Sequence, residues 1–373
     1  MNLQQNAQEI LTDELTKLER LNVSNGAALV TVPSTGEILA MVGSKDYFET
    51  PYGAFNVTTA PRQPGSSIKP LMYSLALERS YTAASTIDDN PVIFKNAGSK
   101  PFQPVNYDGK YHGKVTLRYA LANSYNIPAV KVLNSLGVLN FIDHARTLGI
   151  TTWLDPSRYG LSLTLGGGEV TMTDMSTAFG TFANAGEKVD LNPILKIEDY
   201  RGNVLYIKES DAKIPRVVLS KYVAYIISSI LSDSDARKIA FGSNSRLDIP
   251  GYTVAVKTGT TNDKRDNWTI GYTPKFLTAV WVGNNDNTPM NQALVSGITG
   301  AAPIWNRIMT TVLKTDIKPA TDKGVTNTFI KPAGIIEKPC YFGKMEYFVP
   351  GTESLANCHE GLFNLTPTPI DQQ

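Results

Sequence analysis

The sequence predicts an α+β domain in which helices flank an antiparallel sheet, with a helical subdomain and a small β unit near the C-terminal end. Residues 26–43 have the alternation of a β-hairpin, and residues 251–285 have the pattern of a three-stranded meander. The stretch between them, roughly 80–245, alternates helical patterns with loops. Because strands lie at both ends of the main domain, we expect the hairpin and the meander to join in one sheet.

The first elements follow from the spacing of apolar residues. Residues 3–22 predict an amphipathic helix, and its apolar face contains Leu3, Ile10, Leu11, Leu15, Leu18 and Leu21. The hairpin turns at Pro33-Ser34-Thr35-Gly36, between two runs that alternate in the manner of strands. From Ser66 to about Arg79 the pattern becomes helical again.

The later elements follow in the same way. The clearest helices of the middle third are predicted at Val115–Leu136, Thr171–Ala185 and Leu219–Leu231. The meander contains three β-branched runs, at Tyr252–Lys257, Trp268–Tyr272 and Phe276–Val282. Beyond about residue 316 the chain is rich in Pro, Lys and Thr. We therefore expect a helical lead-in (1–22), a main domain (23–315), and a linker with a small appended unit (316–373).

Composition excludes several classes of protein. The 373 residues carry 35 basic and 34 acidic side chains, so a net charge of +1 leaves no electrostatic footprint for nucleic acid or an anionic membrane. The longest strongly apolar stretch, Tyr222–Leu231, is about half as long as a membrane span. The N-terminus lacks the basic-then-apolar pattern of a signal peptide. Two cysteines and three histidines leave little material for a zinc site, so no metal is expected.

A candidate nucleophile lies at the start of the helix predicted from Ser66. Ser66-Ser67-Ile68-Lys69 places a serine and a lysine three residues apart, and residues i and i+3 share one helix face. A lysine acts as a base at neutral pH only if its pKa falls by about three units, at a cost of roughly 4 kcal/mol. Such a site needs a dry pocket and a second cation. The same spacing recurs in Ser210-Asp211-Ala212-Lys213, but that segment is a charged loop with no helical pattern after it.

Two further segments supply what this pair lacks. Ser124-Tyr125-Asn126, just inside the helix predicted from Val115, offers a hydroxyl for proton relay and an amide for a peptide carbonyl. Taken alone, that segment is more simply interpreted as the punctuation of a helix or a turn. Lys257-Thr258-Gly259-Thr260 ends the first meander strand. Lys257 is the candidate second cation, and the hydroxyls of Thr258 and Thr260 suit a carboxylate. Gly259 removes a side chain, which lets a substrate approach the strand edge.

Histidine is the usual alternative partner of a nucleophilic serine. His112, His144 and His359 lie in no recognisable motif. His112 belongs to a loop rich in Tyr and Gly, where a solvated side chain is the simpler interpretation. A Ser–His–Asp triad stays open at this point, without support.

The order of the three segments resembles the motif set of penicillin-binding proteins and β-lactamases, Ser-x-x-Lys, Ser-Asp-Asn and Lys-Thr-Gly. Tyr125 stands where the second motif has Asp, which is similar to the form found in penicillin-binding proteins. Longer segments resemble the transpeptidase domain of bifunctional, class A penicillin-binding proteins, and the likeness covers about residues 5–315. These segments are Thr35–Gly43, Arg62–Pro70, Gly113–Leu121, Asn267–Pro274 and Ala279–Gly283.

The resemblance implies a serine D,D-transpeptidase with the fold of penicillin-binding transpeptidases and β-lactamases. Such an enzyme cross-links peptidoglycan stem peptides through an acyl-enzyme on Ser66, after releasing terminal D-alanine, and is acylated by β-lactams. Lys69, neutral in the free enzyme, would take the proton from Ser66. Ser124 and Lys257 would pass it to the departing D-alanine. No metal or organic cofactor is implied.

The remaining site residues are expected, by the same resemblance, to bind substrate. Backbone N–H groups of Ser66 and Thr260 would hold the oxyanion. Thr258 and Thr260, beside Gly259, would hold the carboxylate of the leaving D-alanine. Asn126 would bind the peptide amide.

The resemblance also bears on location. It implies an extracytoplasmic site at the bacterial cell surface or the periplasmic face of the plasma membrane, where a disulfide between Cys340 and Cys358 can persist. The alternative is two unpaired thiols in a small β unit. Class A proteins carry a membrane anchor and a glycosyltransferase domain before this region, and only 65 residues precede Ser66. We therefore expect membrane attachment only through an anchor absent from this chain, and no polymerisation of sugar chains.

Two alternatives share these motifs. A D,D-carboxypeptidase or a β-lactamase of the same fold would use water in place of the acceptor amine. A non-catalytic β-lactam sensor would acylate once and would not turn over on peptide.

Overall fold

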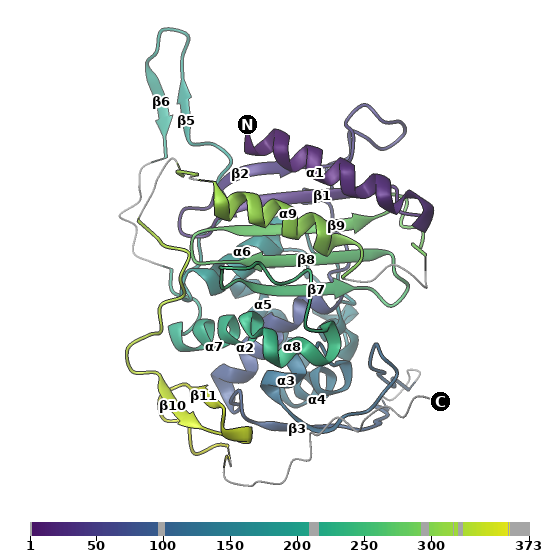
Figure 1. Cartoon of the computed structure of the whole chain (residues 1–373), viewed down its shortest axis with the longest axis vertical. Coiled ribbons are helices and arrows are strands. Elements are labelled where there is room, and N and C mark those ends of the chain that lie inside the picture. Colours follow the sequence, from purple (N-terminus) through teal and green to yellow (C-terminus); the bar gives the residue numbers. More distant parts are fainter. Residues whose placement is uncertain are drawn as a thin grey trace.

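The computed structural model of the chain describes residues 2–95, 101–208, 216–291, 298–315, 317–319, 324–356 and 358. Its centre is a five-stranded antiparallel sheet with the order β2-β1-β9-β8-β7 (Figure 1). The strands are β1 (Asn25–Val32), β2 (Glu37–Val42), β7 (Ala255–Thr260), β8 (Asp266–Tyr272) and β9 (Leu277–Gly283). Pairing of β1 with β9, which places Ala27 opposite Trp281, joins the hairpin to the meander as predicted.

Both faces of the sheet are buried, because side chains alternate between two separate apolar layers. On β1, Ala28 and Val30 pack into the layer formed with α1 (Leu3–Leu18) and α9 (Ala301–Lys314). Ala27 and Leu29 pack into the larger layer on the opposite face. Figure 1 shows α1 and α9 lying across one face of the sheet. This arrangement confirms the predicted α+β class with flanking helices.

The larger layer is a helical subdomain against the other face and the β7 edge of the sheet. It is built by α2 (Lys69–Arg79), α3 (Leu117–Ala122), α4 (Asn126–Leu136), α5 (Val138–Leu148), α6 (Met172–Ala183), α7 (Lys221–Ser232) and α8 (Ser234–Phe241). Two short strand pairs are inserted, β3 (Thr86–Asp89) with β4 (Gly113–Thr116), and β5 (Lys196–Glu198) with β6 (Val204–Ile207). Short 3-10 helices lie at Glu19–Leu21, Val57–Thr59, Gly65–Ile68, Pro156–Arg158, Leu161–Leu165 and Tyr341–Gly343.

The helix predicted over residues 115–136 is wrong as a single element. Its first residues pair in β4, and the rest forms α3 and α4, separated by three residues. Between them Ser124 has a left-handed backbone (φ 61) and Tyr125 is extended. The apolar spacing continued across this break because both helices bury residues in the same layer. Ser124 therefore lies in a turn between two helices and not inside one.

The C-terminal unit is a hairpin of β10 (Ile336–Pro339) and β11 (Met345–Phe348), as predicted. The predicted disulfide between Cys340 and Cys358 is present. The hairpin contacts the helical subdomain through Tyr347. Its ring packs in a T-shaped arrangement with the ring of Tyr225 on α7, and the two ring centroids lie 5.2 Å apart. Within the described ranges, no helix combines the length and apolarity that a membrane crossing requires.

Candidate active site

Ser66 lies in the 3-10 turn Gly65–Ile68, which leads directly into α2. Its side chain is half-buried and makes no side-chain hydrogen bond among the described residues. The neighbouring Ser67 is fully buried, and its Oγ donates to Pro64 O at 2.7 Å, which fastens the start of the turn. Trp268 on β8 anchors the preceding loop, because its Nε1 donates to Gln63 O at 2.9 Å. Ser66 is therefore presented on a fixed turn with its hydroxyl available.

The turn is pressed against strand β7, and this contact requires glycine on both sides. A Cβ at Gly259 would overlap the carbonyl oxygen of Pro64 and would lie 3.0 Å from Ser67 Cβ. Gly65 has a positive φ of 54, and a Cβ there would lie 2.7 Å from the backbone of Thr260. The side of Gly259 on which a Cβ would stand is thus filled by the turn that carries Ser66. Because Gly259 has no side chain, the turn that carries Ser66 can lie directly against strand β7.

Lys69, Ser124, Asn126 and Lys257 form one hydrogen-bonded cluster. Lys257 Nζ donates to Ser124 Oγ at 2.8 Å and to Thr258 O at 2.9 Å. Lys69 Nζ donates to Ser124 O at 2.7 Å, Tyr125 O at 3.1 Å and Asn126 Oδ1 at 2.7 Å, and lies 3.5 Å from Ser124 Oγ. The Ser124 hydroxyl therefore lies between two lysine amines.

Both amines are held in a dry environment. Lys69 is fully buried and Lys257 is 3% exposed. Burial, together with the nearby Lys257, holds the pKa of Lys69 well below its ordinary value, and Asp89 acts in the opposite direction. Burial lowers the pKa of Lys257 to about 7. The dry pocket and the second cation that the sequence called for are thus both present around Lys69.

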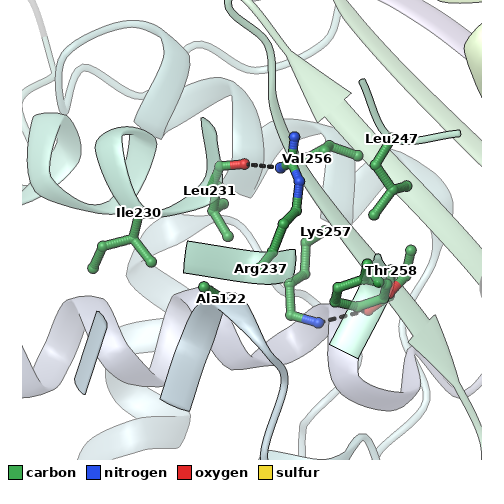
Figure 2. Close-up of a pocket in the computed structure, with 9 residues that line it drawn as sticks. Ala122, Ile230, Leu231, Arg237, Leu247, Val256, Lys257 and Thr258 are labelled. Carbon is green, nitrogen blue, oxygen red and sulfur yellow. Dashed lines mark hydrogen bonds between the residues drawn. The ribbon is translucent and has the colours of Figure 1, made fainter. Parts of the chain in front are cut away.

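A small cavity lies behind Lys257 and explains part of its desolvation. The lining of this cavity is largely apolar and includes Ile230, Leu231, Leu247 and Val256, which Figure 2 draws together with Lys257. The volume, about 10 Å³, is the size that holds one water molecule at most. The stem of Lys257 therefore borders an apolar cavity with little room for water.

The predicted meeting of Ser66 Oγ and Lys69 Nζ is not made as a hydrogen bond in this structure. The i, i+3 spacing places both residues on one side of the turn, but the turn at Ser124–Asn126 offers the amine three oxygens at once. A lysine ammonium has three donors, and these three contacts use all of them. These contacts hold the Lys69 amine at the Ser124–Asn126 turn.

Thr258 and Thr260 lie on β7, the strand at one edge of the sheet, which is hydrogen-bonded to β8. Thr260 Oγ1 accepts from Asn267 Nδ2 at 3.2 Å, and Asn267 Oδ1 in turn accepts from the N–H of Ala301. Thr260 is half-buried and Thr258 is 6% exposed. Sequence reasoning did not single out Asn267 and Trp268 as supports of the site, although adjacent polar and aromatic residues in a buried strand were a usable signal.

The interpretation of His112 as a solvated loop residue is wrong. Its Nδ1 donates to Asp89 Oδ2 at 2.6 Å, and its Nε2 lies 3.1 Å from Asp108 Oδ2. The ring stacks on Tyr125 with a centroid distance of 4.0 Å and an interplanar angle of 13°. Its side chain is only 18% exposed. His112 therefore packs against the turn that carries Ser124.

His144 takes part in an arrangement that resembles a triad. Ser74 Oγ lies 2.8 Å from His144 Nε2, and Glu78 Oε2 lies 3.7 Å from His144 Nδ1. However, Ser74 is fully buried in α2 and donates to Leu71 O of its own helix. A substrate cannot reach that hydroxyl, so the group is part of the core. His359 and the Ser210–Lys213 segment lie outside the described residues.

The buried imidazole of His144 predicts a pH-dependent stability. Burial, with a smaller contribution from Arg79, lowers the pKa of His144 to about 4. The unfolded chain binds a proton below about pH 6.5, whereas the folded protein does so only near pH 4. The free energy of unfolding should therefore fall between these values as pH decreases, by up to about 3 kcal/mol.

Urea unfolding between pH 7 and pH 4 measures this effect against a His144→Gln variant. Asp266, whose pKa burial raises to about 6, contributes a slope of opposite sign in both proteins, so the difference between the two curves isolates His144. Parallel curves would contradict the prediction.

Comparison with known proteins decides the family. A model of the penicillin-binding protein transpeptidase domain matches residues 26–310, a range that includes Ser66, Ser124 and Lys257. The chain belongs to this family of penicillin-binding protein transpeptidase domains. The resemblance inferred from the three motifs is confirmed.

Two curated relatives of the transpeptidase domain illustrate the match. Penicillin-binding protein 2D of Bacillus subtilis is 32% identical over 373 residues, covering 96% of this chain and 51% of the relative. Penicillin-binding protein 1A of Neisseria flavescens is 35% identical over 312 residues, covering 81% of this chain and 38% of the relative. The chain thus spans about half the length of these relatives, or less.

Solved structures agree with the fold of the transpeptidase domain. Penicillin-binding protein 1A from Haemophilus influenzae superposes with a TM-score of 0.73 at 28% identity, covering 88% of this chain and 54% of that one. PonA1 from Mycobacterium tuberculosis, solved in complex with penicillin V, superposes with a TM-score of 0.69 at 23% identity, covering 89% and 90%. The second comparison supports the fold alone.

Proposed function

We propose that this transpeptidase domain is a serine D,D-transpeptidase acting on peptidoglycan stem peptides. The observation that carries the proposal is the buried pair of lysine amines on either side of the Ser124 hydroxyl, next to the turn that presents Ser66. A serine nucleophile needs a neighbouring base, and a buried lysine amine with a lowered pKa can serve where no histidine contacts the serine. The family membership supports the same reaction class.

In the proposed acylation, Ser66 Oγ attacks the carbonyl carbon of the penultimate D-alanine while its proton passes to neutral Lys69 Nζ. The backbone N–H groups of Ser66 and Thr260 hold the oxyanion. When the C–N bond breaks, Ser124 Oγ and Lys257 Nζ pass a proton to the nitrogen of the leaving D-alanine. The 2.8 Å contact between Lys257 and Ser124 supports this relay.

Substrate binding is proposed for the remaining residues. The carboxylate of the leaving D-alanine lies against the hydroxyls of Thr258 and Thr260, beside Gly259. Asn126 donates one N–H of its amide to Val105 O at 2.7 Å, which leaves the second N–H for a substrate carbonyl. An amine of a neighbouring stem peptide then attacks the ester and forms the cross-link. By the same family argument, we propose an extracytoplasmic location and β-lactams as acylating inhibitors.

Intact mass followed over time after adding excess benzylpenicillin tests the proposal. We expect one added mass equal to that of the drug, mapped by peptide digestion to Ser66 and stable for minutes to hours. An adduct that vanishes while drug is consumed would indicate a β-lactamase instead. No adduct would contradict the proposed chemistry.

A second measurement separates the remaining candidates. Released D-alanine is quantified from a stem-peptide substrate with and without an acceptor amine. Cross-linked product identifies a transpeptidase, release with water alone identifies a D,D-carboxypeptidase, and acylation without any turnover identifies a sensor.

A further inference from the structure

A buried carboxylate that the proposed mechanism does not use lies close to the site. Asp89, at the end of β3, is fully buried. It accepts hydrogen bonds from Asn106 Nδ2 at 2.9 and 2.8 Å, from the backbone N–H of His112 at 3.1 Å, and from His112 Nδ1 at 2.6 Å. Moving a charge out of water costs free energy, and proteins keep a buried charge only where hydrogen bonds compensate for the lost water. The contacts of Asp89 therefore fix His112 and Asn106 in place.

Both of these residues act on the turn that carries Ser124. Asn106 Oδ1 accepts from the N–H groups of Asn126 at 2.7 Å and of Ile127 at 3.3 Å, which satisfies the open N–H groups at the start of α4. The His112 ring lies flat against the Tyr125 ring. This ring is a second contact on the turn, and Asp89 holds it as it holds Asn106.

The backbone of the same turn holds the base of the proposed reaction. Tyr125 O and Ser124 O accept two of the three hydrogen bonds of Lys69 Nζ. A rotation of the Tyr125 peptide moves these oxygens, and with them the amine and the Ser124 hydroxyl. The chain of contacts thus runs from Asp89 through His112 and Tyr125 to Lys69.

We propose that His112, held by Asp89, is a positioning residue for acylation of Ser66, because its ring fixes Tyr125 and the Ser124 turn. The inference rests on the proposed function and adds to it a residue that never touches substrate. The contact with Asp89 determines which kind of side chain can replace His112. An ionised carboxylate only accepts, so the atom at the Nδ1 position must donate a hydrogen. The contact with Asp108 is on the outside, where the carboxylate is 45% exposed.

Three variants of the full chain separate the contributions of the His112 ring, its contact with Asp89 and its contact with Asp108. His112→Ala removes the ring and the donor. His112→Asn keeps an amide N–H near the Nδ1 position and so preserves the contact with Asp89. Asp108→Asn changes only the outer contact and is the matched control. Each is tested with benzylpenicillin for the non-covalent Kd and for the first-order acylation rate at saturation, and thermal melting verifies that each variant is folded.

We expect His112→Ala to acylate about 10- to 100-fold more slowly at saturation, since small misplacements of reacting groups have effects of this size. Its Kd should change less than about threefold, because the ring does not touch the ligand, whereas a general loss of structure would raise Kd in proportion. His112→Asn should recover part of the rate, and Asp108→Asn should resemble the wild type. Wild-type acylation in His112→Ala, or a full wild-type rate in His112→Asn, which has no ring to fix Tyr125, would overturn the inference alone. If His112→Ala does not fold, the comparison of His112→Asn with Asp108→Asn decides, and equal wild-type rates in both overturn it. Failure of the wild type to acylate overturns the proposed function as well.

Discussion

Replacing Ser66 by alanine is expected to abolish covalent labelling by benzylpenicillin. The substitution removes the oxygen that forms the ester in the proposed reaction, and it leaves Lys69, Ser124 and Lys257 in place. Because Ser66 Oγ has no side-chain hydrogen-bond partner within the described residues, its removal breaks no internal contact. Stability should therefore stay close to that of the wild type, and the loss of labelling reports on chemistry. Intact mass after overnight exposure to the drug measures the effect.

Ser210→Ala is the matched control, since Ser210 begins the second Ser-x-x-Lys of the chain. It should label at the wild-type rate. Labelling that survives the Ser66 substitution would show that a different residue forms the ester and would reject the assignment of the nucleophile.

Replacing Glu346 by alanine is expected to destabilise the protein by about 3–5 kcal/mol, because it leaves a buried guanidinium without its main partner. Arg118 is 7% exposed and Glu346 is 6% exposed. The pair is bidentate, with Arg118 Nε to Glu346 Oε2 at 2.8 Å and a second nitrogen to Oε1 at 2.5 Å. After the substitution only Asp233, at 3.3 Å, and the weaker contacts to Ser229 remain. Urea unfolding followed by tryptophan fluorescence measures the change.

The same hairpin provides a control. Glu337 pairs with Lys331 at 2.6 Å, but both side chains are largely solvated, at 32% and 49% exposed. Glu337→Ala should cause a much smaller loss. The double variant Arg118→Met with Glu346→Leu should recover most of the stability, since apolar residues can replace a buried ion pair. A double variant as unstable as Glu346→Ala would show that packing of the hairpin, and not the unpaired charge, carries the effect.

The sheet was predictable because strand alternation is a local signal. The hairpin at β1 and β2 and the meander at β7–β9 each fold from adjacent residues, and the turns between them lie in the sequence itself. Helix α9 was missed, although Ile304, Trp305, Ile308, Met309 and Val312 have helical spacing and are fully buried. Its apolar spacing is that of an amphipathic helix that directly follows the sheet strands in the sequence.

The order of Ser66, Lys69, Ser124 and Lys257 in the sequence was enough to predict the family, and it is the basis of the chemistry proposed for it. The tertiary structure decided how these groups meet. The Lys69 amine contacts oxygens 55 to 57 positions away, and Lys257 reaches Ser124 across 133 positions. A helical repeat predicts which residues share a face but not where a helix breaks, and the break at Ser124 brings three oxygens to the Lys69 amine. Likewise, Gly259 packs against the distant turn that carries Ser66, and His112 stacks on Tyr125. Such contacts could not be predicted from local sequence, because close packing depends on which surfaces meet after folding.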